Sequence, residues 1–279
     1  MNKLITLIKN KPILSTLILI ILANSLTEFP LQNYLSNFMP YEAALMLSIF
    51  TLQIGCFGFL MYLSHKLGIS NTFNINLSKP IKSLWIALPF SILIIIYIAD
   101  QMKLEFITNK PLIFILYLFA FLSTGFFEEI LFRGIAFNLI NNKLGSNNKG
   151  FYFSVFISNF IFGTCHITHL LDGTMPLINF LNQMFYAFVI GILFTALYVR
   201  CNTLLIPILI HGLIGVTGYT NFLSITSQDL YLQSLIQSTI TYKNIIASLI
   251  IFLPLLIWGV FLLRKANPNN NTISSEITI

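Results

Sequence analysis

The sequence predicts an all-α, polytopic membrane protein with about eight transmembrane helices and both termini in the cytoplasm. Three observations predict this class. First, the 279 residues are 56% hydrophobic and only 9% charged, whereas soluble domains contain about 25% charged residues. Second, apolar runs long enough to cross a bilayer recur along the whole chain. Third, basic residues gather between alternate runs, as the positive-inside rule expects of cytoplasmic segments.

The elements follow from these apolar runs. The predicted spans are residues 13–31, 43–63, 83–98, 111–139, 151–171, 177–199, 204–219 and 245–263. The first follows three lysines and ends near an Ala-Asn-Ser, so it also has the form of a signal peptide. We interpret it as a retained helix and leave its cleavage open. Residues 1–266 then form one transmembrane domain, and the polar residues 267–279 form a tail that we expect to be disordered.

Lysine and arginine orient the chain. With the N-terminus in the cytoplasm, the opposite side of the membrane holds only Lys103, Lys110 and Lys243. We therefore expect a multi-pass membrane protein that is surrounded by lipid, and the sequence does not determine its oligomeric state. The net charge of +6 is scattered along the chain, so no nucleic-acid partner is indicated. The three dispersed cysteines suit neither a disulfide framework nor a thiolate zinc site.

Five ionisable residues lie inside predicted spans: Glu128, Glu129, Arg133, His166 and His211. A charged group at the bilayer centre costs about 2.5–3.5 kcal/mol, so these side chains should face the protein interior or a watery cavity. Glu129 precedes Arg133 by one helical turn, which is the favourable order for an ion pair. Glu128 points about 100° away from that pair. The ion pair thus accounts for Glu129, whereas Glu128 is left free to face another group.

A carboxylate and two imidazoles that meet in a low-dielectric pocket suit the hydrolysis of an amide. Glu128 could take a proton from water and return it later, while a histidine shares that proton or holds the oxyanion. Alternatively, Glu128, His166 and His211 could ligate a divalent metal such as zinc that activates the water. The same residues also have a purely structural interpretation. The Glu-Arg pair could serve folding or packing alone, Asn159 could form a hydrogen bond between helices, and Phe162 could simply be an aromatic residue on the same helix face as His166.

The order and spacing of these residues resemble one family. The motifs are Glu-Glu-x-x-x-Arg at Glu128, Glu129 and Arg133; Phe-x-x-x-His at Phe162 and His166; and His211, preceded by Arg200-Cys201-Asn202-Thr203-Leu204 and Pro207. This pattern resembles the CPBP family, which contains CAAX prenyl endopeptidases together with bacteriocin-processing and bacteriocin-immunity proteins. The resemblance covers about residues 118–218, and the chain looks more like the bacterial branch, whose substrates include leader peptides, signalling peptides and bacteriocins.

The resemblance implies a helical intramembrane protease whose site opens toward the cytoplasm and whose partner is a membrane-associated peptide or protein. Glu128 would activate water together with His166, and His211 would help to form the oxyanion site. Glu129 and Arg133 would tie their helix to its neighbours. Members are described both as metalloproteases and as metal-free glutamate proteases, and the residue set leaves this open.

The chain departs from the family pattern at Gly215, where the family usually has Asn or Asp as a second oxyanion donor. Asn159 could substitute for it. The departure leaves a second hypothesis, a catalytically silent member that acts as a membrane scaffold or confers bacteriocin immunity by binding. A third hypothesis is a proton-coupled transporter that uses the Glu and His residues. The motifs of other intramembrane protease classes, His-Glu-x-x-His, Gly-x-Gly-Asp and Gly-x-Ser-Gly, are absent from the sequence.

Overall fold

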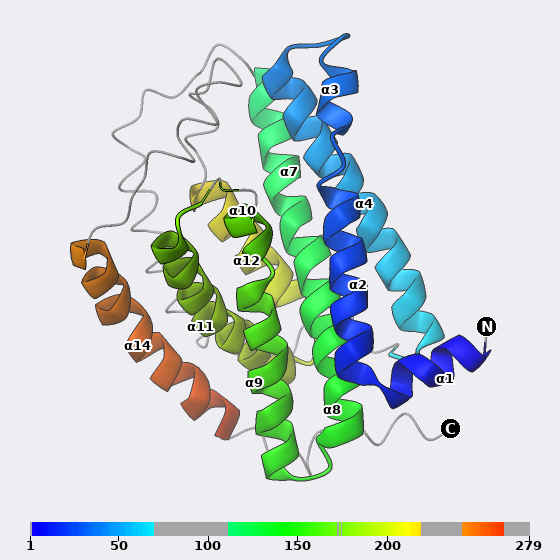
Figure 1. Ribbon diagram of the computed structural model, residues 1–279, viewed down its shortest axis with the longest axis vertical. Helices are drawn as coiled ribbons and strands as arrows, with labels where there is room; N and C mark the ends of the chain where they lie inside the picture. The colour runs from blue at the N-terminus through cyan, green and yellow to red at the C-terminus, as the bar shows by residue number, and fades with distance from the viewer. Residues whose placement is uncertain (1, 70–110, 172, 174, 219–241, 265–279) are drawn as a thin grey trace.

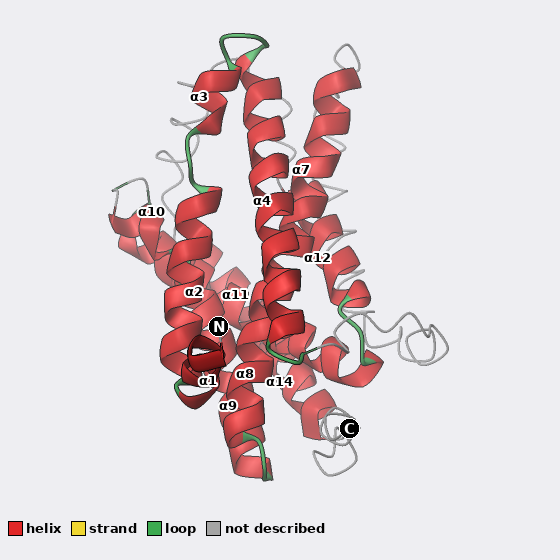
Figure 2. Ribbon diagram, turned by 90° about the vertical axis from the view of Figure 1, so that its right-hand side faces the viewer, coloured by secondary structure: helices red, strands yellow, loops and turns green. Residues whose placement is uncertain are grey.

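In the computed structural model, the described residues are 2–69, 111–171, 173, 175–218 and 242–264, and their regular elements are all helices (Figures 1 and 2). Five helical stretches in this part are long and apolar enough to cross a membrane: Pro12–Leu35, Tyr41–Lys66, Pro111–Leu144, Leu177–Cys201 and Tyr242–Arg264. The predicted all-α class is therefore confirmed for the described residues. The predicted span 83–98 and the tail 267–279 lie outside them, and the total number of spans and their orientation stay predictions.

The chain begins with α1 (Asn2–Asn10), which lies across the lower end of the bundle and turns at Lys11 into α2 (Pro12–Thr27) (Figure 1). Proline suits the first turn of a helix because its missing N–H has no partner there in any case. The short α3 (Leu31–Leu35) then leads to α4 (Tyr41–Lys66), which runs back to the end where the chain began.

The central helix contains a π-helical segment. It runs as α7 (Pro111–Glu129), continues as the π segment η3 (Ile130–Phe137) and ends as α8 (Asn138–Leu144). Wider turns disturb the regular hydrogen-bond ladder and often occur at functional sites. Here the side-chain amide of Asn138 donates to the carbonyl oxygens of Arg133 and Gly134, at 3.0 Å in both cases. The π segment directly follows the two glutamates that the sequence singles out.

The predicted span 151–171 is divided in the structure. Helix α9 (Asn148–Thr164) starts at Asn147, whose side chain accepts a hydrogen bond from the Gly150 N–H, and it ends before His166. His166 therefore lies in a turn that leads into the short α10 (Ile167–Leu171), rather than inside one continuous helix. An apolar run of this length does not by itself reveal an internal turn.

The remaining helices agree with the predicted spans to within a few residues. They are α11 (Leu177–Cys201), α12 (Leu205–Gly218) and α14 (Tyr242–Arg264). Helix α11 ends at Asn202, which has the left-handed backbone (φ 52°) typical of a residue that stops a helix. The chain then turns directly into α12, which is shorter than a full span.

Helix α7 packs on α4 and on α12, and glycine allows the second contact to be close. A Cβ atom added at Gly125 would lie 2.5 Å from the Ile208 carbonyl oxygen and 2.9 Å from the Gly212 nitrogen. One added at Gly212 would lie 2.9 Å from Leu122 Cδ2. Small residues commonly let membrane helices approach backbone to backbone. This approach brings His211 on α12 next to the glutamates on α7.

Charge divides the described part of the bundle into two ends. The basic residues at the end where the chain begins are Lys3, Lys9, Lys11, Lys66, Lys143, Lys149, Arg200 and Arg264. The other end carries Glu28 after α2, Glu42 in the first turn of α4 and Lys243 at the start of α14 (Figure 1). This separation is the one that the positive-inside rule gives for a cytoplasmic lower end.

Candidate active site

The ion pair that the spacing predicts between Glu129 and Arg133 is present. Arg133 Nη1 lies 2.9 Å from Glu129 Oε1, and the two side chains are 1% and 0% exposed. The pair continues from the end of α7 into the π segment, so the wider turn does not separate the two residues. Buried charges of this kind are tolerated only when they are paired and hydrogen-bonded.

His211 lies between the two neighbouring carboxylates. Its Nδ1 is 2.7 Å from Glu129 Oε1, and its Nε2 is 3.5 Å from Glu128 Oε2. With Glu129 ionised, the Nδ1–H donates to it, which fixes the orientation of the ring and directs Nε2 toward Glu128. Glu129 is fully buried, whereas Glu128 and His211 keep exposed fractions of 19% and 16%. The adjacent acids therefore have different environments: one holds the imidazole, and the other is accessible.

Arg133 is held by helices α9 and α11 as well as by Glu129. Its Nη2 donates to Asn159 Oδ1 at 3.2 Å, and its guanidinium carbon lies 4.5 Å from the ring centre of Phe162 and 5.4 Å from that of Phe194. A guanidinium over aromatic faces gains cation–π attraction, which increases when the group is desolvated. The cation is thus fixed from several directions.

Asn159 links this cluster to α11. Its amide group donates to the Val155 carbonyl oxygen at 2.8 Å and to Thr195 Oγ1 at 3.0 Å. Thr195 in turn donates to the Gly191 carbonyl oxygen at 3.0 Å. A Cβ atom at Gly191 would lie 2.5 Å from Asn159 Oδ1 and 2.9 Å from Arg133 Nη2, so glycine leaves the room that this hydrogen bond needs.

A pocket of about 210 Å³ opens beside Glu128 between α7, α9, α11 and α12. Its lining residues are Phe121, Thr124, Glu128, Phe162, His166, Tyr186, Ala187, Ile190, Phe194, His211, Ile214 and Gly215. The ring of His211 stacks on Phe194, with ring centres 5.1 Å apart at 23°. The walls are thus mostly aromatic and aliphatic, with a carboxylate and imidazoles as the polar groups, which is the common character of a ligand site.

Comparison with known proteins agrees with this geometry. Residues 110–217 match the family described as Type II CAAX prenyl endopeptidase Rce1-like. This match supports the resemblance of residues 110–217 to the CPBP family. No curated protein and no solved structure matches the chain. The matched segment contains the π segment together with α7, α9, α11 and nearly all of α12, and these four helices form the pocket.

Motif residues from three separate parts of the sequence meet in this one pocket, while Glu129 and Arg133 are buried beside it. Glu128, Phe162, His166, His211 and Gly215 all line it. Their catalytic roles remain those that the resemblance implies. Asn159 lies behind the pocket, buried at 1% exposure, and both its amide nitrogen and its oxygen have partners inside the cluster. In this arrangement Asn159 has no N–H directed into the pocket, which disfavours it as a replacement oxyanion donor.

Metal binding depends on how the donor atoms are grouped. Among the described residues, no three His, Cys, Asp or Glu side chains are grouped so that they could hold a metal ion. His211 uses Nδ1 for Glu129, and its Nε2 lies 3.5 Å from Glu128 Oε2. These two contacts are compatible with a metal ligand as well as with a partner of a general base.

Sequence reasoning missed several contacts among the residues of the candidate site. It did not foresee that Glu129 holds His211, or that Gly191 and Thr195 on α11 complete the surroundings of Arg133 and Asn159. A signal for the second contact exists in the sequence, because a glycine and a threonine one turn apart interrupt an otherwise apolar span. The first contact depends on how α7 crosses α12, which no local pattern encodes.

Proposed function

We propose that the protein is an intramembrane endopeptidase that hydrolyses a peptide bond of a membrane-associated or leader-type peptide with a water activated at Glu128. One observation carries this proposal: an accessible carboxylate lies 3.5 Å from an imidazole whose other nitrogen is fixed by a second, buried carboxylate. That arrangement supplies a base beside an oriented acid, facing an apolar pocket. The protein acts in the plasma membrane with its basic end in the cytoplasm.

Glu128 acts as the general base in this proposal. Its carboxylate takes a proton from water, the resulting hydroxide attacks the scissile carbonyl carbon, and the same proton passes to the leaving amine when the C–N bond breaks. His166 lines the same pocket and shares in holding the attacking water. The carboxylate ends the cycle as it began, so the step consumes only water and the peptide bond.

His211 stabilises the oxyanion. Glu128, Glu129 and Arg133 together carry one net negative charge, so an imidazolium at His211 makes the cluster neutral, which lowers the free energy needed to keep it away from water. An imidazolium donates through both ring nitrogens. One N–H is used by Glu129, and Nε2–H is then available to the carbonyl oxygen that becomes negative.

The test replaces Glu128 by glutamine, which keeps the size of the side chain and removes the base. We compare peptide N- and C-termini in cells that carry the wild type or Glu128→Gln at equal membrane abundance. The expected result is the loss of a defined set of termini, because general-base catalysis contributes roughly 10²–10⁴-fold to the rate. Glu42→Gln, in the first turn of α4 and away from the pocket, is the matched control and should leave those termini unchanged.

The alternative is a silent CPBP member that confers immunity or acts as a scaffold by binding. It is favoured by Gly215, which lines the pocket without offering a donor side chain. A Cβ atom there would lie 3.3 Å from Phe121 Cδ1, so a larger side chain requires a small movement of that ring. Identical termini in the wild type and Glu128→Gln, together with a phenotype on deletion that Glu128→Gln rescues, would reject the protease and support this alternative.

A further inference from the structure

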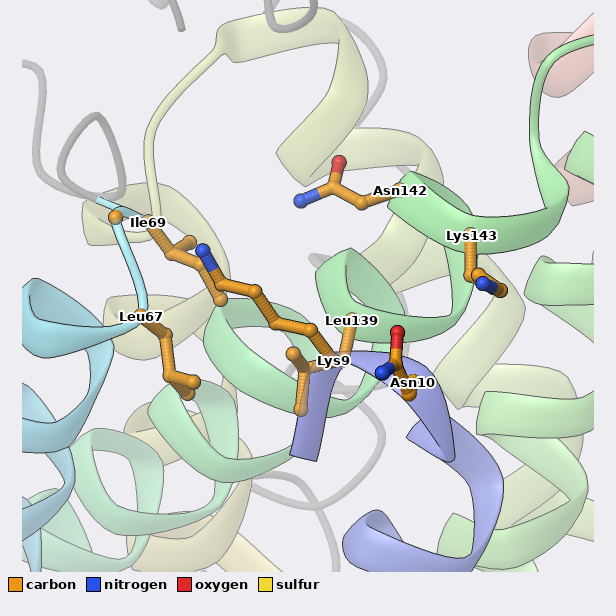
Figure 3. A pocket seen from close by; sticks show the side chains of 8 residues that line it. Lys9, Asn10, Leu67, Ile69, Leu139, Asn142 and Lys143 are labelled. Atoms are coloured by element: carbon orange, nitrogen blue, oxygen red, sulfur yellow. The ribbon is translucent and has the colours of Figure 1, made fainter. Parts of the chain in front are cut away.

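A second pocket lies at the basic end of the bundle, away from the glutamates. It measures about 440 Å³ and is formed by the end of α1, the residues that follow α4, and α8 (Figure 3). Its polar lining residues are Lys9, Asn10, Asn142 and Lys143, and its apolar lining includes Leu67 and Leu139. Figure 3 shows Lys9 extending toward Ile69, with Asn142 across from it and Lys143 on the other side of Asn10. The pocket therefore combines two cations and two amide groups with an apolar wall.

The two lysines have no counter-charge among the described residues. Neither Lys9 nor Lys143 forms an ion pair or a side-chain hydrogen bond there. The acids in this part of the chain are Glu28 and Glu42 at the opposite end and the two glutamates of the site. Two like charges that share a pocket repel each other, and a bound anion would remove that repulsion.

The neighbouring helix has the form of one that lies along a membrane surface. On α1, Ile5 and Ile8 pack against the hydrophobic core, whereas Lys3 and Lys9 are exposed. The helix lies across the start of α2 rather than along it (Figure 1). Amphipathic helices with this pattern lie in the headgroup region of a bilayer. The pocket is thus at the depth where lipid phosphates are found.

We propose that this pocket binds the phosphate headgroup of an anionic phospholipid. The lysines and amide groups satisfy the phosphate oxygens, as basic pockets at the cytoplasmic ends of membrane helices do. The acyl chains follow the apolar wall toward exposed side chains of the adjoining α2, such as Leu14 and Leu17. The lipid joins α1, α4 and α8, and α8 continues the helix that carries Glu128 and Glu129. This proposal does not depend on the proposed function.

The experiment measures the unfolding midpoint of the full chain in a neutral detergent during titration with phosphatidylglycerol. A ligand that binds the folded state raises the midpoint, and the shift grows with the logarithm of the ligand concentration above its dissociation constant. Phosphatidylcholine with the same acyl chains and inorganic phosphate are titrated in parallel. The test variant is the double substitution Lys9→Gln and Lys143→Gln. Its control is Lys3→Gln with Lys149→Gln, which removes the same charge from exposed positions at the same end but outside the pocket.

Phosphatidylglycerol should stabilise the wild type and the control variant, whereas phosphatidylcholine should not. The Lys9 and Lys143 variant should need a roughly 30-fold higher lipid concentration for the same shift, since each lysine near a charged membrane contributes about 1 kcal/mol. An equal loss of lipid affinity in both double variants would indicate a general attraction to the basic surface and would overturn the proposal of a binding site in this pocket. An equal shift with inorganic phosphate at matched concentration would overturn the lipid as its occupant, and no shift with phosphatidylglycerol would overturn both.

Discussion

Helices α11 and α14 lie side by side and have similar lengths, 25 and 23 residues, but they face different surroundings. The most apolar window of α11 has a mean hydropathy of 1.8 and is 67% buried inside the protein, whereas that of α14 has 2.7 and is 17% buried. The more apolar helix is therefore the less buried one. In a soluble protein the opposite holds, because exposure there means contact with water.

The difference shows how a membrane protein separates its residues. Lipid tails solvate leucine and isoleucine as well as a protein core does, so apolar character does not drive α14 inward. Helix α11 is instead the helix with small and polar residues, and these surround the buried Arg133 and Asn159. Of these two helices, the one that surrounds buried polar groups is therefore the more buried one. The contrast can be tested by matched pairs of substitutions, one in the polar cluster that α11 surrounds and one elsewhere in the bundle.

The largest effect is expected from removing the cation on the buried face. Arg133→Met leaves Glu129 buried with only His211 as a partner, and breaking a buried ion pair typically costs about 3–5 kcal/mol. Arg200→Met is the control near the α14 side, where the guanidinium donates to the Leu262 carbonyl oxygen, and we expect about 1 kcal/mol. The free energy of unfolding in mixed micelles measures both. Equal losses would show that the buried face has no special sensitivity.

An intermediate effect is expected from adding one methyl group. Gly191→Ala pushes against Asn159 Oδ1 and Arg133 Nη2, which are fixed by hydrogen bonds, and overpacking of this kind costs about 1–3 kcal/mol. Gly259→Ala, on α14, meets Ile192 Cγ2 at 2.9 Å, which is the end of a side chain that can move. It should change the unfolding free energy by less than about 1 kcal/mol, partly offset by the better helix propensity of alanine. A larger loss of unfolding free energy for Gly259→Ala than for Gly191→Ala would contradict the greater sensitivity that we expect of the buried face of α11.

The smallest effect is expected from removing one hydroxyl group. Thr195→Val takes away the acceptor of one Asn159 N–H, while the other N–H keeps the Val155 carbonyl oxygen, so the loss should be about 1 kcal/mol. Thr217→Val on α12 is the control, because its hydroxyl donates only to carbonyl oxygens of its own helix. The thermal unfolding midpoint should fall for the first variant and stay nearly constant for the second. An unchanged midpoint for Thr195→Val would show that this hydroxyl does not help to hold Asn159 and Arg133 in place.

Much of the fold could be predicted from the sequence, because a span depends on length and composition alone. The ranges expected for α4, α11, α12 and α14 agree with the structure to within a few residues, and the expected span 111–139 lies within the helical stretch Pro111–Leu144. The ion pair between Glu129 and Arg133 follows from spacing along one helix. The turn at His166 was not predicted, because the only break signals nearby are Gly163 and the polar residues after it, and these lie inside an otherwise apolar run.

The relations between helices were harder to predict. That Glu128, His166 and His211 share a pocket was expected from the topology, which limits the depth of each residue in the membrane. Which carboxylate oxygen faces which ring nitrogen depends on rotation about the helix axes. That rotation is set by close approaches such as the one at Gly125, and these exist only in the assembled bundle.

The π segment at Ile130–Phe137 has a consequence for the comparison of related chains. A π turn holds about one residue more than an α turn, so the segment absorbs one extra residue while the parts of the helix before and after it keep their relative orientation. A relative with one residue fewer here would form a regular α-helix and would still direct its glutamates the same way relative to α8. A single gap in an alignment at this place therefore marks a change of helix type and not a rotated site.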